Sequence, residues 1–96
     1  MIAARDEKRR ELTLFVSGAS DLSARAIADA RALCDVHYQL SIVDVHEDPA
    51  AVLSHGVLAA PTLVRSQPLP LRRFIGDLSQ TDAVLLKLEI APHASD

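Results

Sequence analysis

Few residues in this 96-residue chain could carry out covalent chemistry, and its single cysteine comes first among them. Because Cys34 is the only thiol, the chain cannot form an intramolecular disulfide, a C-x-x-C dithiol site or a cysteine-cluster metal site. A thiol–disulfide enzyme needs its reactive cysteine at the start of a helix, and the corresponding stretch, SGASDLS at residues 17–23, contains no sulfur. We therefore expect Cys34 to be a buried apolar residue rather than a redox centre.

Serines and histidines offer a second kind of chemistry. Ser17, Ser20 and Ser23 could be nucleophiles with His37 or His46 as the base. However, the nucleophile-elbow pattern G-x-S-x-G is missing, and helix caps and turns account for these serines more simply. We therefore expect no catalytic residue.

Metal and phosphate sites are also not indicated. The chain has four histidines, His37, His46, His55 and His93. None of their spacings places two ligands on one helix face, so we expect solvated or loop histidines. A G-x-x-x-x-G-K-[ST] phosphate loop is also missing. We therefore expect neither a bound metal nor a cofactor.

The bulk composition is that of one globular domain, with 49% hydrophobic and 24% charged residues. The net charge of −3 argues against a nucleic-acid partner, because phosphate contacts require concentrated Lys and Arg. No apolar stretch approaches the length of a membrane span, and the N-terminus lacks the apolar core of a secretory signal. With one cysteine, a reducing cytoplasmic location fits best. We expect a flexible lead-in at residues 1–10, a domain at 11–90 and a tail at 91–96.

The first half of the domain reads as strand, helix, strand, helix. Residues 12–16, LTLFV, have the character of a buried strand. Ser20 is the expected cap of a helix whose apolar face is predicted to contain Leu22, Ala26, Ile27, Ala30, Leu33 and Cys34. A second strand is predicted at 38–45. Asp48 and Pro49 then start a short helix, which ends before Gly56.

The second half reads as strand, strand, helix. Strands are predicted at 61–64 and 71–75, separated by the proline-rich turn SQPLP at 66–70. SQTD at 79–82 resembles a capping box for the last helix. The resulting order, β-α-β-α-β-β-α, predicts an α/β fold of the thioredoxin-like type, with a mixed four-stranded sheet and helices on both faces. In such a fold Pro61 would lie at the head of a strand, and we expect the Ala60–Pro61 bond to be cis.

Two basic clusters could be recognition surfaces. Arg72 and Arg73 alternate along the fourth predicted strand, so one is expected to point outward while the other covers the sheet edge. Arg5, Lys8, Arg9 and Arg10 are interleaved with acidic residues, which favours a solvated segment without a specific role.

Four stretches give the chain a resemblance to a known family. They are LTLFVSG at 12–18, DVHEDP at 44–49, LAAPTLV at 58–64 and, most distinctively, PLPLRRFIGDLS at 68–79. On these residues, and over roughly 11–90, the chain resembles the KaiB family of circadian-clock proteins. The resemblance implies a non-enzymatic protein that docks on the ring of a KaiC-type ATPase, with KaiA-like or histidine-kinase proteins as further partners.

The resemblance also implies a change of fold. Family members exist as a thioredoxin-like monomer or as a tetramer with the order β-α-β-β-α-α-β. The switching segment would run from about Asp48 onward, with Gly76 and Asp77 at its sensitive turn and Pro61 as a third fold-switch residue. The Asp48–Pro49 helix start and Gly56 favour the thioredoxin-like state as the resting state.

The predicted partner-binding residues follow from this resemblance and from the basic pair. They are Ala60, Pro61, Leu71, Arg72, Arg73, Ile75, Gly76 and Asp77. Two alternatives remain at this point: a sensor domain of the SasA kinase type, and a degenerate thioredoxin-like protein that retains Cys34 without dithiol activity.

Overall fold

The strands and helices follow the expected order in a computed structural model that describes residues 10–34 and 38–90. The elements of these residues are β1 (Glu11–Val16), α2 (Asp21–Leu33), β2 (Gln39–Asp44), α3 (Pro49–Ser54), β3 (Thr62–Gln67), β4 (Arg72–Ile75) and α4 (Thr81–Leu88). The strands form one mixed sheet in the order β2-β1-β3-β4, in which β1 and β2 are parallel and the other pairs antiparallel. The predicted thioredoxin-like α/β fold is confirmed.

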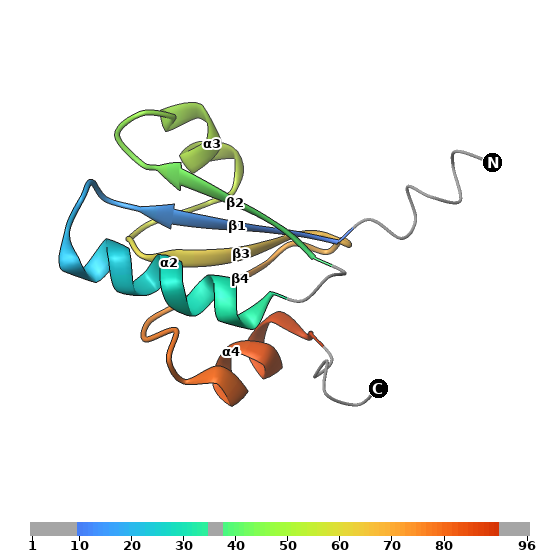
Figure 1. Cartoon of the computed structure of the whole chain (residues 1–96). Coiled ribbons are helices and arrows are strands. Elements are labelled where there is room, and N and C mark those ends of the chain that lie inside the picture. Colours follow the sequence, from blue (N-terminus) through green and yellow to red (C-terminus); the bar gives the residue numbers. More distant parts are fainter. Residues whose placement is uncertain (1–9, 35–37, 91–96) are drawn as a thin grey trace.

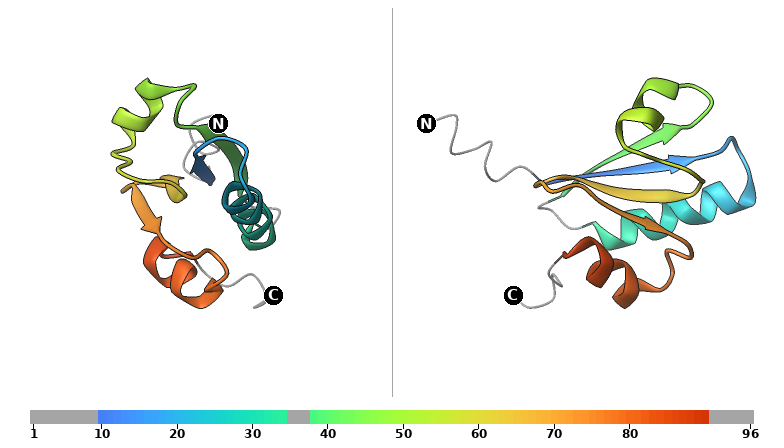
Figure 2. Two further views of the ribbon diagram at one scale, coloured as in Figure 1. Left: turned by 90° about the vertical axis from the view of Figure 1, so that its left-hand side faces the viewer. Right: turned by 180° about the vertical axis from the view of Figure 1, so that it is seen from behind.

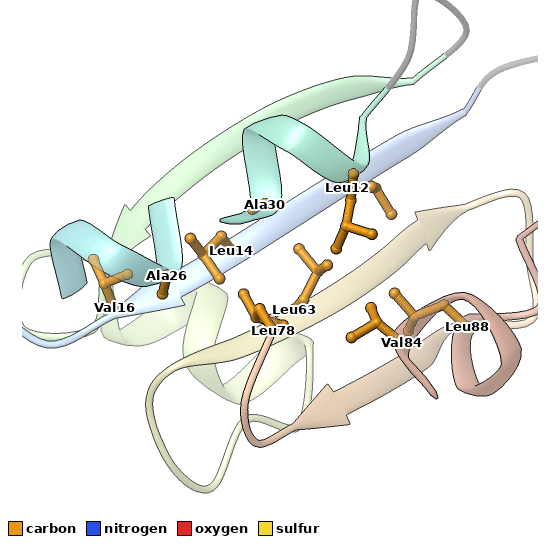
Figure 3. Close-up of a cluster of buried hydrophobic side chains, with 10 residues drawn as sticks. Leu12, Leu14, Val16, Ala26, Ala30, Leu63, Leu78, Val84 and Leu88 are labelled. Atoms are coloured by element: carbon orange, nitrogen blue, oxygen red, sulfur yellow. The ribbon is translucent and has the colours of Figure 1, made fainter. Parts of the chain in front are cut away.

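Helices cover both faces of the sheet: α2 and α4 lie on one side and α3 on the other (Figures 1 and 2). Alternation along β1 supplies both faces, since Leu12, Leu14 and Val16 face α2 and α4 while Phe15 faces α3. Figure 3 shows how side chains from β1, α2, β3 and α4 meet in the larger cluster. The smaller cluster consists of Phe15, Val57 and Val64, against which Ala51 and Val52 of α3 pack.

The first two helices begin at the capping residues predicted from the sequence. The Ser20 Oγ accepts a hydrogen bond from the Ser23 main-chain N–H at 3.1 Å, and the Asp48 Oδ1 accepts one from Ala51 at 3.1 Å. These bonds satisfy N–H groups that have no partner inside the helix. Gly56 follows α3 with φ of +65°, the left-handed conformation expected there.

The predicted capping box at residues 79–82 is wrong. The helix α4 begins at Thr81, and the residue before it, Gln80, makes no capping bond with its side chain. The Ser79 hydroxyl instead donates to the Asp77 Oδ1 at 2.7 Å, inside the preceding turn. Ser79 therefore stabilises the turn that leads to α4 rather than the helix itself.

The apolar face of α2 differs from the expected one at its first turn. Leu22 is 60% exposed, whereas Ser23 is buried and donates from Oγ to the main-chain oxygen of Ser17 at 3.3 Å. Ala26, Ala30 and Leu33 are buried as expected. Cys34 is half-buried rather than fully buried, and it packs against the larger cluster.

Strand β3 extends to Gln67, further than the predicted end at Val64. Its extra residues keep pairing with β1, since Arg65 lies opposite Leu12 and Gln67 opposite Glu11. The proline turn is therefore shorter than expected.

Candidate partner-binding site

A cleft at one end of the sheet brings together five of the eight predicted partner-binding residues. Its volume is about 410 Å³. The predicted residues that line it are Ala60, Pro61, Ile75, Gly76 and Asp77, and its opposite wall is formed by Leu22, Arg25, Ala26 and Asp29 of α2, with Leu78 beside them. Segments far apart in the sequence thus meet at the first turns of α2.

Strand register explains why these residues meet. Thr62 pairs with Ile75 across β3 and β4, so Pro61 and Gly76 lie next to each other at the same end of the pair. The Ala60–Pro61 peptide bond is cis, as expected. The connector before it is fixed by a hydrogen bond from the Thr62 Oγ1 to the Ala59 carbonyl at 2.6 Å.

The cleft has an apolar surface with a charged rim. Leu22 is 60% and Ile75 55% exposed, although both are large aliphatic side chains. At the rim, hydrogen bonds from the Ser79 hydroxyl and main-chain N–H lower the pKa of Asp77, and the nearby Arg25 charge lowers it further. An apolar centre with charges at its edge is the usual anatomy of a protein–protein contact.

The remaining three predicted residues lie in β4 or directly before it, outside this cleft. Leu71, Arg72 and Arg73 line a second hollow of about 590 Å³, together with Phe74, Ile75 and Lys87. Ile75 borders both hollows, so the eight predicted residues form two neighbouring surfaces rather than one.

Arg72 and Arg73 point to opposite faces of the sheet, in line with the expected alternation. Arg72 Nη2 forms an ion pair with Glu89 Oε2 at 3.0 Å, just beyond α4. The Arg73 Nη1 donates to the His55 carbonyl at the end of α3, at 3.2 Å. Both guanidinium groups therefore hold a helix end as well as facing solvent.

The α2 wall of the cleft was not predicted from the sequence. The apolar periodicity of α2 predicts a core position for Leu22, and Arg25 and Asp29 fall outside the predicted apolar face. The signal that could have corrected this lies in Ser20 and Ser23, whose hydroxyls bond to each other at 3.1 Å and turn Ser23 inward. Ser23 therefore takes the buried position in the first turn of α2, and Leu22 lines the cleft beside Ala26.

The two histidines that the structure describes, His46 and His55, have separate partners. His55 Nδ1 lies 2.9 Å from the Ala51 carbonyl and its ring packs at 5.3 Å from that of Phe15, whereas His46 is exposed. His37 and His93 lie outside the described residues, as does most of the N-terminal basic cluster. Within residues 10–34 and 38–90, no group of three His, Cys, Asp or Glu side chains could hold a metal ion. None of the described helices is long and apolar enough to cross a membrane.

Comparison with known families decides the relationship. The KaiB domain model matches residues 13–90, which includes both walls of the cleft. The chain belongs to the KaiB family. Circadian clock protein KaiB3 of Synechocystis sp. is 38% identical over 91% of this chain and 89% of its own length. The KaiB family member of Synechococcus elongatus named circadian clock oscillator protein KaiB is 37% identical, over 82% of this chain and 81% of its own.

Solved structures agree on the fold. The N-terminal domain of Synechococcus elongatus SasA superposes with a TM-score of 0.67 at 22% identity, covering 84% of this chain and 80% of that one. The thioredoxin Deadhead of Drosophila melanogaster also gives 0.67, at 17% identity over 91% and 88% of the two chains. At these identities the likeness concerns the fold alone, and it places this KaiB family member in the thioredoxin-like arrangement.

Proposed function

We propose that this protein is a KaiB-type binding module that docks on a KaiC-type ATPase in circadian or related regulatory signalling. The family match over residues 13–90 supports the proposal, since relatives across that span are named as circadian clock proteins. A KaiA-like protein or a SasA-type histidine kinase would be a further partner. The protein would act in the cytoplasm, as a monomer in the thioredoxin-like state.

The observation that carries this proposal is the cleft between α2 and the Ile75–Asp77 turn. Large aliphatic side chains left exposed beside one another are characteristic of interaction surfaces, and Leu22 and Ile75 both line this cleft. Docking needs no catalytic group, only this apolar centre and the charges around it.

Fold switching is the second part of the proposal. The segment from Asp48 onward would rearrange between the observed order and β-α-β-β-α-α-β, with a tetramer as the assembly of the second state. Pro61, Gly76 and Asp77 are the residues proposed to control the change. In support, Gly76 has φ of +144°, which only glycine adopts readily, so the turn depends on this residue.

An apolar-to-charged substitution in the cleft tests the docking site. Ile75→Glu should weaken binding to the KaiC homologue of the same organism by about tenfold or more, as expected for a central interface residue. Leu86→Glu on α4 is the matched control, because Leu86 is 80% exposed and lies outside the cleft. Affinity is measured by calorimetry, with circular dichroism to confirm folding. Equal affinities for Ile75→Glu and the unchanged protein would reject the cleft as the docking site.

The arginine pair needs a different design, because Arg72 also holds Glu89. Arg72→Glu places a second carboxylate beside that of Glu89. The double change Arg72→Glu with Glu89→Arg restores the ion pair with the two charges exchanged. If Arg72 contacts the partner, the double variant should fold normally and still bind weakly. Binding at full strength by the double variant would remove Arg72 from the site.

A further inference from the structure

Ser17 and His46 form a hydrogen-bonded pair outside the proposed docking cleft. The Ser17 Oγ lies 3.1 Å from the His46 Nε2, and both residues are exposed. Ser20 and Ser23 serve the cap of α2, as the sequence predicted, but Ser17 has this different partner. A serine hydroxyl bonded to an imidazole nitrogen is the arrangement by which a histidine activates a serine nucleophile.

The main chain holds both members of the pair in place. The Val45 N–H donates to the Val16 carbonyl at 2.8 Å, which joins the ends of β1 and β2 immediately before Ser17 and His46. The His46 N–H donates to the Asp44 Oδ1 at 2.8 Å, and the Ser17 carbonyl accepts from the Ser23 hydroxyl at 3.3 Å. Fixed backbones on both sides reduce the entropy lost in reaching the reactive geometry.

A pocket with mostly apolar side chains opens beside Ser17. Its volume is about 360 Å³, and apart from Ser17 the residues that line it all have apolar side chains: Val45, Val52, Val57, Leu58, Ala59 and Ala60. Pockets of about 300 Å³ and more accommodate small ligands. This one would accept a short aliphatic chain and offers no side-chain charge for a polar ligand.

The geometry points to Ser17 as an acyl-acceptor site, activated by His46, that takes a short aliphatic acyl group from an activated ester or thioester. The Ser17 Oγ attacks the acyl carbonyl carbon while its proton passes to the His46 Nε2. The carbon–oxygen or carbon–sulfur bond to the leaving group then breaks, and the leaving group receives that proton. The product is an acyl ester of Ser17, with the chain in the pocket.

This modification goes beyond the docking function and would act beside it. Ala60 lines both the acyl pocket and the docking cleft, so an acyl chain in the pocket would lie against the cleft wall. The reaction is a single transfer onto the protein and requires no turnover.

Reaction with p-nitrophenyl butyrate tests the inference. The full chain should release nitrophenolate in a burst close to one equivalent, and peptide mapping by mass spectrometry should find the butyryl group on Ser17. Ser17→Ala should abolish the mapped modification. His46→Ala should slow it by about a hundredfold, the lower part of the range for general base catalysis.

Two controls separate this reaction from background acylation. Cys34→Ser should leave the labelling of Ser17 unchanged, and Ser41→Ala, which removes an exposed serine from β2, should do the same. Label on Cys34 or on lysines with none on Ser17 would overturn the inference. An unchanged labelling rate in His46→Ala, with folding confirmed by circular dichroism, would overturn it as well.

Discussion

Arg65 on β3 donates a hydrogen bond from Nη1 to the main-chain carbonyl of Leu88, at 2.9 Å, and so joins the sheet to the end of α4. The same guanidinium bonds to the carbonyls of Glu89, at 3.3 Å, and Pro70, at 2.8 Å. Arg65 is only 5% exposed, and the last carbonyls of a helix have no partner within it. One buried cation therefore satisfies a helix end and the proline turn together.

Removing this guanidinium should be costly. We expect Arg65→Ala to lower the free energy of unfolding by about 3 kcal/mol, because it leaves buried carbonyl groups without a donor. Arg72→Ala is the control and should cost no more than about 1 kcal/mol, since its ion pair with Glu89 is solvent-exposed. Urea unfolding measures both. Similar losses in the two variants would contradict the assigned role of Arg65.

The two glycines with φ near +65° form a matched pair. Gly18 has φ of +68° and open space where a Cβ would lie, whereas a Cβ on Gly56 would lie 3.0 Å from the Arg73 Nη1. Gly18→Ala should cost about 1 kcal/mol from backbone strain alone. Gly56→Ala should cost up to about 1 kcal/mol more, because the Arg73 guanidinium must shift and its hydrogen bond to the His55 carbonyl is weakened.

A double-mutant cycle isolates that second contribution. In an Arg73→Ala background, the two glycine substitutions should have equal effects on the urea midpoint. A difference that persists without the Arg73 side chain would show that the extra cost at Gly56 arises elsewhere.

The carboxyl group of Asp77, in the turn that borders the cleft, should make stability depend on pH. Ser79 lowers the pKa of Asp77 in the folded state, so this carboxylate stabilises the fold above the pKa of an unfolded aspartate. That contribution is lost as the pH falls through the lowered pKa. Ser79→Ala should raise the pKa of Asp77, as measured by carboxyl NMR titration, while Ser54→Ala should leave it unchanged.

The resting state of the switching segment can be read directly by NMR. Secondary chemical shifts should be helical from Pro49 to Ser54, as in α3. Extended shifts across this segment would show that the second state dominates in solution. A ratio of ten to one between the states corresponds to about 1.4 kcal/mol, so a single capping substitution such as Asp48→Ala should shift it measurably.

Local signals predicted the elements whose causes are themselves local. Asp48 and Pro49 determine where α3 begins, and Gly56 determines where it ends. All three act on neighbouring residues in the sequence, so their effects do not depend on the rest of the fold. The same holds for the Ser20 cap of α2. The order of the elements along the chain followed from these local signals.

The errors arose where a side chain had two competing partners. Ser79 could cap α4 or bond to Asp77, and the nearer carboxylate won. Leu22 and Ser23 are neighbours in the first turn of α2. The hydrogen bonds of the Ser23 hydroxyl hold Ser23, and not Leu22, in the buried position. Arg65 escaped notice because its partners, at Pro70 and Leu88, are brought to it only by the folded chain.

The hydrophobic cluster on the α2 and α4 side of the sheet is larger than the cluster on the α3 side, so the two sides should differ in local stability. No residue of α3 is fully buried, whereas α2 and α4 each contribute buried residues to the larger cluster. Amide hydrogen exchange should therefore show two levels of protection. The amide hydrogens of α3 should exchange through local opening, whereas those of β1 and β3 should exchange only through global unfolding. The segment proposed to change its fold thus begins with a helix that is expected to open locally, before the rest of the sheet unfolds.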